Sequence, residues 1–456
     1  MKKKFPLPIK PVTAFFIFFS CSNVSNADNL YSLFNKAKYH SPHLHIAQAQ
    51  QEIAYQKINQ AEATKEPKLN FIGQEKKGAN KTDLNADSKT EYRVQNYALQ
   101  LSVPLFNKVK NEEILSAKLN EKVAIEQFQT NYNELLISLV ESYFKLLNMN
   151  SKLELIKQQK IQVLEQKKMA NANFNQGMVS ITDLKEADAK YTTLLSQENS
   201  LNLEIKREKN ILSEFIGSKE FVVDVKFPTL SQLPPIFEKD QEQFDQLLLT
   251  NNNQIKISKL NLNIAKQEVE KEKAVGYPTI NFTSKLSRNF DSQDSAFVAK
   301  QDGWDYLYGV EMNLPMYNSE NQYKIKELYA TLNKNKYELD LNIQKQRTQM
   351  HEAFYNTLSA ISKTNGMKDA ELASEKAWLS NKRAYEVGMR VNAEVLEAQS
   401  KYYESKQERL TAWYEAWQNY IKLRSILGLL TDNEIIDIDR NFYTRNINSN
   451  LLLNND

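Results

Sequence analysis

The sequence predicts a mixed α/β fold that is made of two repeats within one chain of 456 residues. Two observations predict it. Proline and glycine, which end helices and turn the backbone, recur at one constant offset of 211 residues. Between them lie long segments whose apolar residues step by three and four, and shorter segments in which apolar and polar residues alternate. We therefore expect each half of the chain to hold two β-strands and one very long helical hairpin.

The offset of 211 residues holds without a gap between about 42–217 and about 253–428. The matched breakers are Pro67 with Pro278, Pro104 with Pro315, Gly177 with Gly388 and Gly217 with Gly428. So many prolines and glycines would not keep one constant offset over this distance by chance. The chain is therefore a tandem internal duplication.

The first repeat is expected to begin with a helix and two strands. The helix runs from Pro42 to about Glu66, and Pro67 ends it because proline lacks the N–H that a helix needs. Strands are expected at about 68–77 and 92–103, joined by a polar loop. The expected corners between strands and helices are Pro67, Pro104, Pro278 and Pro315.

Alternation in the second strand of each pair indicates one apolar and one polar face. In the first repeat Tyr97, Leu99 and Leu101 point one way, and their counterparts in the second repeat include Tyr308 and Val310. Such a strand is half-buried, and both a lipid-facing barrel strand and a sandwich strand satisfy the pattern.

Two helices without internal proline follow each strand pair. The first spans about 107–176, which corresponds to roughly 105 Å of helix. Gly177 reverses the chain, and a second helix runs from about Thr182 to Ile216 with heptad-like apolar spacing. In the second repeat Gly388 makes the reversal, and an interruption of the long helix is expected near Gly366.

The apolar segment at the amino end is predicted to be a secretory signal cleaved after Ala27. Cleavage before Cys21 would instead give a lipoprotein, although the preceding residues fit that signal poorly. Removing residues 1–27 takes away four lysines and no acid, so the formal net charge of +3 becomes −1. The basic excess is therefore no evidence for nucleic-acid binding.

The expected division of the chain follows from these boundaries. It comprises the signal at 1–27, the first repeat at 28–217, a linker at 218–240, the second repeat at 241–428 and a carboxyl-terminal segment at 429–456.

Composition argues against enzyme chemistry. Only 10 glycines are present, and no glycine-rich phosphate loop, nucleophile elbow, zinc-protease motif or paired-cysteine motif occurs. The single cysteine excludes a disulfide framework. His40, His43 and His45 cluster, but 43 and 45 do not share a helical face. We expect no cofactor and no bound metal.

The strands limit how the chain can be assembled. Four strands cannot close a barrel, and open strand edges are untenable in lipid. If the strands cross a membrane, three chains would supply twelve of them, an even number as in known barrels. The helices are too polar to enter the bilayer, so they would project into water. A water-soluble coiled-coil protein would share these helices, and this alternative stays open at this point.

The duplicated plan resembles the TolC family of outer-membrane efflux and secretion channels. The best-matching segments are Phe174–Leu184, Tyr385–Arg390 and the corners Val103–Phe106 and Leu314–Tyr317. The resemblance implies a homotrimeric twelve-stranded β-barrel in the outer membrane, continued by a coiled-coil helical barrel in the periplasm. It also implies two partners, namely a periplasmic adaptor and an inner-membrane transporter of the ABC, RND or MFS class.

The resemblance further implies a gate at the helix reversals, where the pore narrows. The matching positions are Thr182, Asp183, Tyr385, Arg390, Glu394 and Glu397, with glutamates where the family pattern has aspartates. Glu394 and Glu397 share a helical face, so three chains would gather six carboxylates at the mouth. The hydrogen-bonded links of such a latch would contribute ~0.5–3 kcal/mol each. Without the resemblance, these acids are typical partners of a helix amino-terminal dipole.

These features favour three possible functions to different degrees. A passive export channel is favoured because two copies of a strand pair and hairpin are present. A secreted periplasmic adaptor is the alternative, although adaptors have a single hairpin flanked by β-domains. An enzyme ranks third, since no catalytic motif occurs.

Overall fold

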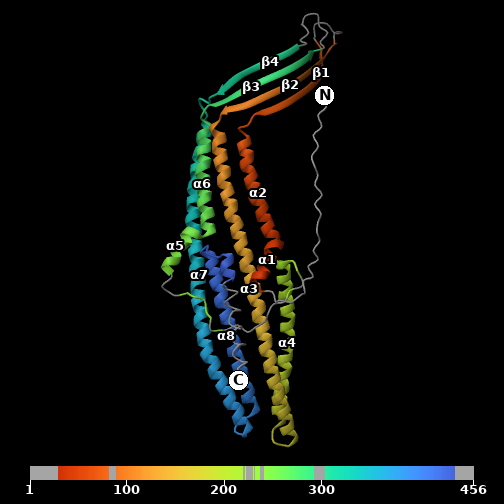
Figure 1. Ribbon diagram of the computed structural model, residues 1–456, viewed down its shortest axis with the longest axis vertical. Coiled ribbons are helices and arrows are strands. Elements are labelled where there is room, and N and C mark those ends of the chain that lie inside the picture. The colour runs from red at the N-terminus through yellow and green to blue at the C-terminus, as the bar shows by residue number, and fades with distance from the viewer. Residues whose placement is uncertain are drawn as a thin grey trace, which may run out of the picture.

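The computed structural model describes residues 29–81, 89–218, 221, 230, 232–236, 241–291 and 303–436. The predicted signal at 1–27, most of the linker and the end of the chain lie outside the described residues. Figure 1 shows a long molecule with the sheet at one end and helices running along its length.

The helices and strands of the two repeats follow one another in the same order. The first repeat consists of α1 (Leu30–His40), α2 (Pro42–Ala63), β1 (Lys68–Lys81), β2 (Lys89–Phe106), α3 (Lys108–Asn175) and α4 (Ile181–Ile216). The second consists of α5 (Gln241–Asn251), α6 (Asn253–Ala274), β3 (Thr279–Asp291), β4 (Gly303–Asn313), α7 (Ser319–Glu386) and α8 (Asn392–Ile426). Helices α5, α6 and α7 begin and end 211 residues after α1, α2 and α3. The duplication is confirmed.

Several predicted boundaries were wrong. Helix α7 runs unbroken through Gly366, because one exposed glycine costs a long helix only about 1 kcal/mol. Strand β1 extends to Lys81 and β2 starts at Lys89, so the loop between them is shorter than expected. Pro104 lies within β2 at a register shift, and the corner itself is at Asn107, whose side chain caps α3.

Two short helices were not predicted. Helix α1 is separated from α2 only by Ser41, whose hydroxyl accepts a hydrogen bond from the Leu44 N–H. Asn252 separates α5 from α6 and caps Ile255 at 2.9 Å. Each of these caps starts a new helix within a stretch that sequence periodicity reads as continuous.

The four strands form one antiparallel sheet in the order β1-β2-β3-β4. In the described part of the chain, the outer edges of β1 and β4 pair with no further strand. Successive side chains alternate between the two faces, and the register places the apolar residues on one of them. This face carries Phe71, Tyr97, Leu99, Phe282, Leu286, Tyr306, Tyr308, Val310 and Met312. The opposite face carries mostly polar residues, including Asn70, Gln74, Gln100, Lys285 and Glu311.

The helices continue the strand order away from the sheet. Helix α2 packs on the upper part of α3, α3 packs on α6, and α6 packs on the upper part of α7. Beyond the middle of the molecule, the hairpin α3–α4 packs beside the hairpin α7–α8 through α3 and α8 (Figure 1). The helical part therefore has two levels of four helices each. Helices α2, α3, α6 and α7 form the level next to the sheet, and α3, α4, α7 and α8 form the level at the far end, so the long helices α3 and α7 run through both.

An apolar core fills the middle of the molecule, where α1, α3, α4 and α8 meet. We call this the equatorial region. The indole N–H groups of Trp413 and Trp417 both donate to the Gln232 carbonyl, at 2.7 and 3.3 Å, so part of the linker packs on α8. The Tyr132 hydroxyl donates to Asp432, and burial together with that bond raises the pKa of Tyr132. The segment after Gly428 is thus bound to α3.

Candidate functional site

The two helix reversals at the end opposite the sheet have the same backbone geometry. At the first, Gly177 has a φ of +73°, and the Met178 N–H donates to the Asn173 carbonyl at 2.9 Å. At the second, Gly388 has a φ of +76°, and Met389 donates to Ala384 at 2.8 Å. This is the Schellman ending of a helix, which requires a left-handed residue and so favours glycine.

After the first reversal, a capping box starts α4. The Ser180 hydroxyl accepts from the Thr182 N–H at 3.0 Å, and the Asp183 carboxylate accepts from the Ser180 N–H at 3.2 Å. The Asp183 carboxylate therefore has a local role in holding the helix start.

After the second reversal, two ion pairs lie on the exposed surface at the beginning of α8. Arg390 bonds Glu394 at 2.6 Å, and Lys401 bonds Glu397 at 2.7 Å, each four residues apart. The Lys401 ammonium holds the pKa of the Glu397 carboxyl below its ordinary value. Both glutamates predicted to line an acidic ring thus carry a cationic partner from their own chain.

The two reversals touch each other through one buried side chain that sequence reasoning missed. The Asn392 amide is fully buried and donates to the Asp183 carbonyl at 3.3 Å. Tyr385 is not bonded to Asp183 within one chain; among the described residues its buried hydroxyl has no hydrogen-bond partner. No pattern in the sequence pointed to Asn392, because its function depends on a contact between repeats.

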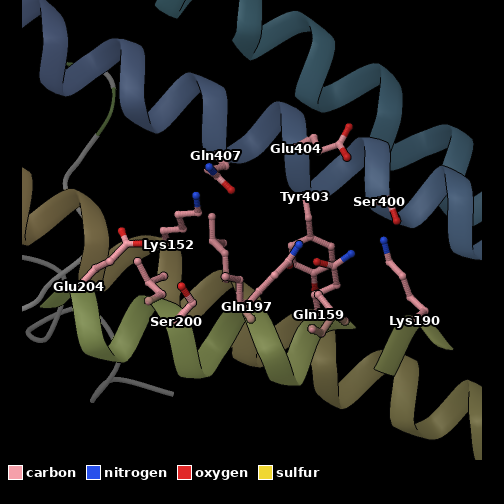
Figure 2. Close-up of a pocket in the computed structure, with 14 residues that line it drawn as sticks. Lys152, Gln159, Lys190, Gln197, Ser200, Glu204, Ser400, Tyr403, Glu404 and Gln407 are labelled. Atoms are coloured by element: carbon pink, nitrogen blue, oxygen red, sulfur yellow. The ribbon is translucent and has the colours of Figure 1, made fainter. Parts of the chain in front are cut away.

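A polar groove lies above the reversals, between α4 and α8, with α3 as its floor. It has a volume of about 320 Å³. Figure 2 shows Glu404 and Gln407 on α8 across from Glu204, Ser200 and Gln197, with the Tyr403 ring reaching down between them. The groove was not predicted, since its walls come from different repeats.

Ion pairs across the first hairpin also went unpredicted. Lys167 bonds Asp188 at 2.5 Å, Lys160 bonds Glu198, and Lys145 bonds the buried Glu208 at 2.7 Å. The sequence contains a pattern that could have predicted these ion pairs. Two helices that reverse at Gly177 bring together residues about equally far from it, and opposite charges stand at such positions.

None of the helices in the described part of the chain combines the length and the apolar composition needed to cross a bilayer.

The sheet and the helices together define a class of protein. A sheet with one apolar face, one polar face and two open edges matches a fragment of a transmembrane barrel, whose lipid face is apolar and whose lumen is polar. The helices stand side by side in the same order as the strands and extend from the sheet into water. The class is a membrane-anchored conduit completed by further copies of the chain.

Comparison with known proteins agrees with this class. The model of the outer membrane efflux protein family matches residues 33–218 and 245–429. The outer membrane protein TolC of Salmonella enteritidis is 24% identical, over 92% of this chain and 85% of the relative. The proteases secretion protein PrtF of Dickeya chrysanthemi is 20% identical, over 78% of this chain and 77% of the relative.

Solved structures share the fold. A structure of CusC has a TM-score of 0.76 at 17% identity and covers 93% of this chain and 99% of its own. The open state of the Neisseria gonorrhoeae MtrE outer membrane channel has a TM-score of 0.71 at 14% identity, covering 88% of this chain and 89% of its own. The chain belongs to the outer membrane efflux protein family. It is an exit duct of the outer membrane, with its helices in the periplasm.

Proposed function

We propose that three copies of the chain close a twelve-stranded barrel above a twelve-helix tunnel. The observation that carries this proposal is the four-stranded sheet with one apolar face and two open edges, whose strand order the helices repeat. Neither edge can stay open in lipid, so further copies must cover both. With three copies arranged in this way, the helices surround a hollow interior.

The duct works passively, and its partners supply energy and select the cargo. We propose a periplasmic adaptor and an inner-membrane ABC, RND or MFS transporter as these partners. The relatives named for protease secretion favour protein export, while the description of the family as outer membrane efflux proteins favours efflux. A deletion strain tested for antibiotic sensitivity and for missing secreted proteins separates the two kinds of cargo.

The gate is proposed to lie at the helix reversals and to involve Thr182, Asp183, Tyr385, Arg390, Glu394 and Glu397. Two features support this location. The Tyr385 hydroxyl is buried without a hydrogen-bond partner in the described part of one chain, so a movement of the helix ends can give it one. A polar contact joins the two hairpin ends, since the Asn392 amide donates to the Asp183 carbonyl at 3.3 Å. Links of ~0.5–1.5 kcal/mol each suit a latch that must open.

Loosening this latch is expected to widen the pore. The double variant Tyr385→Phe with Arg390→Glu removes a hydroxyl and reverses a charge at the second reversal, so single-channel conductance in a planar bilayer should rise. The matched control is Tyr337→Phe with Lys334→Glu, which also removes a tyrosine hydroxyl and reverses a basic charge, but in the half of α7 nearer the sheet. Unchanged conductance in the first variant would remove the gate assignment.

Ion selectivity should depend on the cationic partners at the mouth. Lys401→Met leaves three copies of Glu397 uncompensated, and unpaired carboxylates around a mouth attract cations and repel anions. The K⁺/Cl⁻ permeability ratio should therefore rise severalfold, and Glu397→Gln should lower it. Without Lys401 the pKa of Glu397 returns upward, so the gained cation preference should fade as the pH falls through about 4–5. Reversal potentials measured across a salt gradient, at neutral and acid pH, decide the matter.

A further inference from the structure

The apolar face of the sheet ends in a row that contains an arginine. The register sets Arg288 on β3 opposite Tyr97 on β2 and opposite Trp304 on β4, so all three side chains lie on the apolar face. This row lies toward the end of the sheet that is away from the helices (Figure 1). Because the helices are in the periplasm, that end of the sheet points to the outside of the cell.

The height of this row matches the outer boundary of the hydrocarbon. From Met312, near the helices, to Trp304, strand β4 covers about 27 Å at ~3.4 Å per residue. At a strand tilt of about 40° this corresponds to about 21 Å across the membrane, close to the ~25 Å apolar band of a barrel. Trp304 and Arg288 therefore lie where aromatic residues gather at the interface and where an arginine is tolerated at little cost.

Two aromatic rings hold the Arg288 side chain on this face. Its guanidinium carbon lies 4.8 Å from the centroid of the Phe290 ring and 5.5 Å from that of the Trp304 ring. Both rings are exposed on the apolar face. Within the part of the chain that the structure describes, no carboxylate forms an ion pair with Arg288. The guanidinium is therefore fixed in place by cation–π contacts while its N–H donors stay available to an anion.

Further cations stand on the same face beyond this row. Arg93 bonds Glu75 at 2.7 Å, and Lys77 lies 3.9 Å from the same carboxylate. Together with Arg288, the described side chains here comprise three cations and one acid. We call Lys77, Arg93 and Arg288 the outward basic patch. Its excess of positive charge adjoins a surface that faces lipid.

We infer that the outward basic patch binds the phosphate groups of a lipid in the outer leaflet, with Arg288 as the central contact. A guanidinium matches the geometry of a phosphate and binds it through paired N–H groups. The acyl chains of the same lipid would then lie on the adjoining apolar rows, which contain Leu99, Leu286 and Tyr306. The inference rests on the proposed barrel, whose apolar face meets lipid, and adds the class of lipid.

The position of Arg288 argues for lipid against other occupants. Strand β3 is paired on both sides, with β2 and with β4 of its own chain, whereas the open edges where another copy would join belong to β1 and β4. A soluble polyanion would have no apolar part to cover the rows beside the patch. A phosphorylated lipid supplies both the anion and the apolar chains.

Lipid binding to the assembled full chain tests the inference. The protein in detergent is titrated with bisphosphorylated lipid A, and native mass spectrometry gives the Kd. Arg288→Met should raise this Kd about fivefold, the usual contribution of one arginine near an anionic lipid surface. Arg288→Lys keeps the charge but loses the paired N–H geometry, so it should raise the Kd less.

The matched control removes a positive charge from the other face of the same strand. Lys285 lies opposite Gln100 on the polar face, so Lys285→Met should leave the Kd for bisphosphorylated lipid A unchanged. Lipid A without its phosphates should bind the wild type and both variants equally weakly. Equal affinity of the wild type for the two lipids would show that the phosphates are not recognised.

The outcomes separate this inference from the proposed assembly. If the wild type is trimeric and inserts into vesicles but Arg288→Met binds bisphosphorylated lipid A as the wild type does, the patch is not a lipid site and the assembly stands. If inorganic phosphate displaces the lipid, a free anion is the ligand and the inference is overturned. If the wild type is monomeric and does not insert, both fail.

Discussion

Leu99→Arg is expected to keep the chain out of the outer membrane. Leu99 lies on the apolar face of the sheet, opposite Phe71 on β1 and Leu286 on β3, in the part where the strands pair continuously. An arginine facing lipid near the bilayer midplane costs about 2–4 kcal/mol, and an assembly of three copies carries three of them. Membrane fractionation and a gel that resolves the heat-sensitive trimer measure the loss.

The control for this variant is the next residue along the strand. Gln100→Arg places the same side chain on the polar face, so it should assemble and insert almost as the wild type does. If both variants insert equally well, the apolar face is not in contact with lipid and the orientation of the sheet proposed above is wrong.

Trp413→Ala is expected to lower the free energy of unfolding by about 3–5 kcal/mol, the usual cost of removing a large buried aromatic side chain. Trp413 is buried in the equatorial region, and its ring packs edge-on against Tyr414 and Trp417. Its indole N–H also holds the linker through the Gln232 carbonyl at 2.7 Å. Thermal unfolding of the detergent-solubilised protein measures the effect.

A second substitution at the same position separates packing from hydrogen bonding. Trp413→Phe retains most of the ring contacts and loses the donor to Gln232, which still accepts from Trp417 at 3.3 Å. Its cost should be near 1 kcal/mol for the hydrogen bond plus the smaller volume. If Trp413→Phe were as destabilising as Trp413→Ala, the hydrogen bond to Gln232 and not the ring packing would hold this region. If neither variant lowered the free energy of unfolding, the indole would not anchor it.

The sequence predicted most of the architecture because the features that set it are local. Gly177 and Gly388 each end a helix by a backbone conformation that favours glycine, and proline excludes itself from helix interiors. Because of the duplication, each boundary is also marked by an equivalent residue 211 positions away. Helices α1 and α5 were missed because one capping residue, Ser41 or Asn252, separates each from a longer helix with the same periodicity.

The candidate site was less predictable, because its contacts join distant parts of the chain. Asn392 meets the Asp183 carbonyl across the two repeats, and no local pattern marks such a pair. The partners of Glu394 and Glu397 are different, since Arg390, just before α8, and Lys401, on α8, each stand four residues from their glutamate. Within the helix, that spacing predicts the ion pair of Glu397 with Lys401. The net charge of the mouth, unlike its shape, could therefore have been inferred from sequence.

The two open strand edges also set the kinetics of biogenesis. One chain can form its own four-stranded sheet, but within the described residues the backbone groups on the outer edges of β1 and β4 have no strand partner until other chains arrive. Because lipid does not tolerate such groups, insertion has to follow or accompany a multi-molecular encounter. The rate of insertion should consequently rise more steeply than linearly with the concentration of exported chain, so a modest drop in synthesis would deplete finished channels disproportionately.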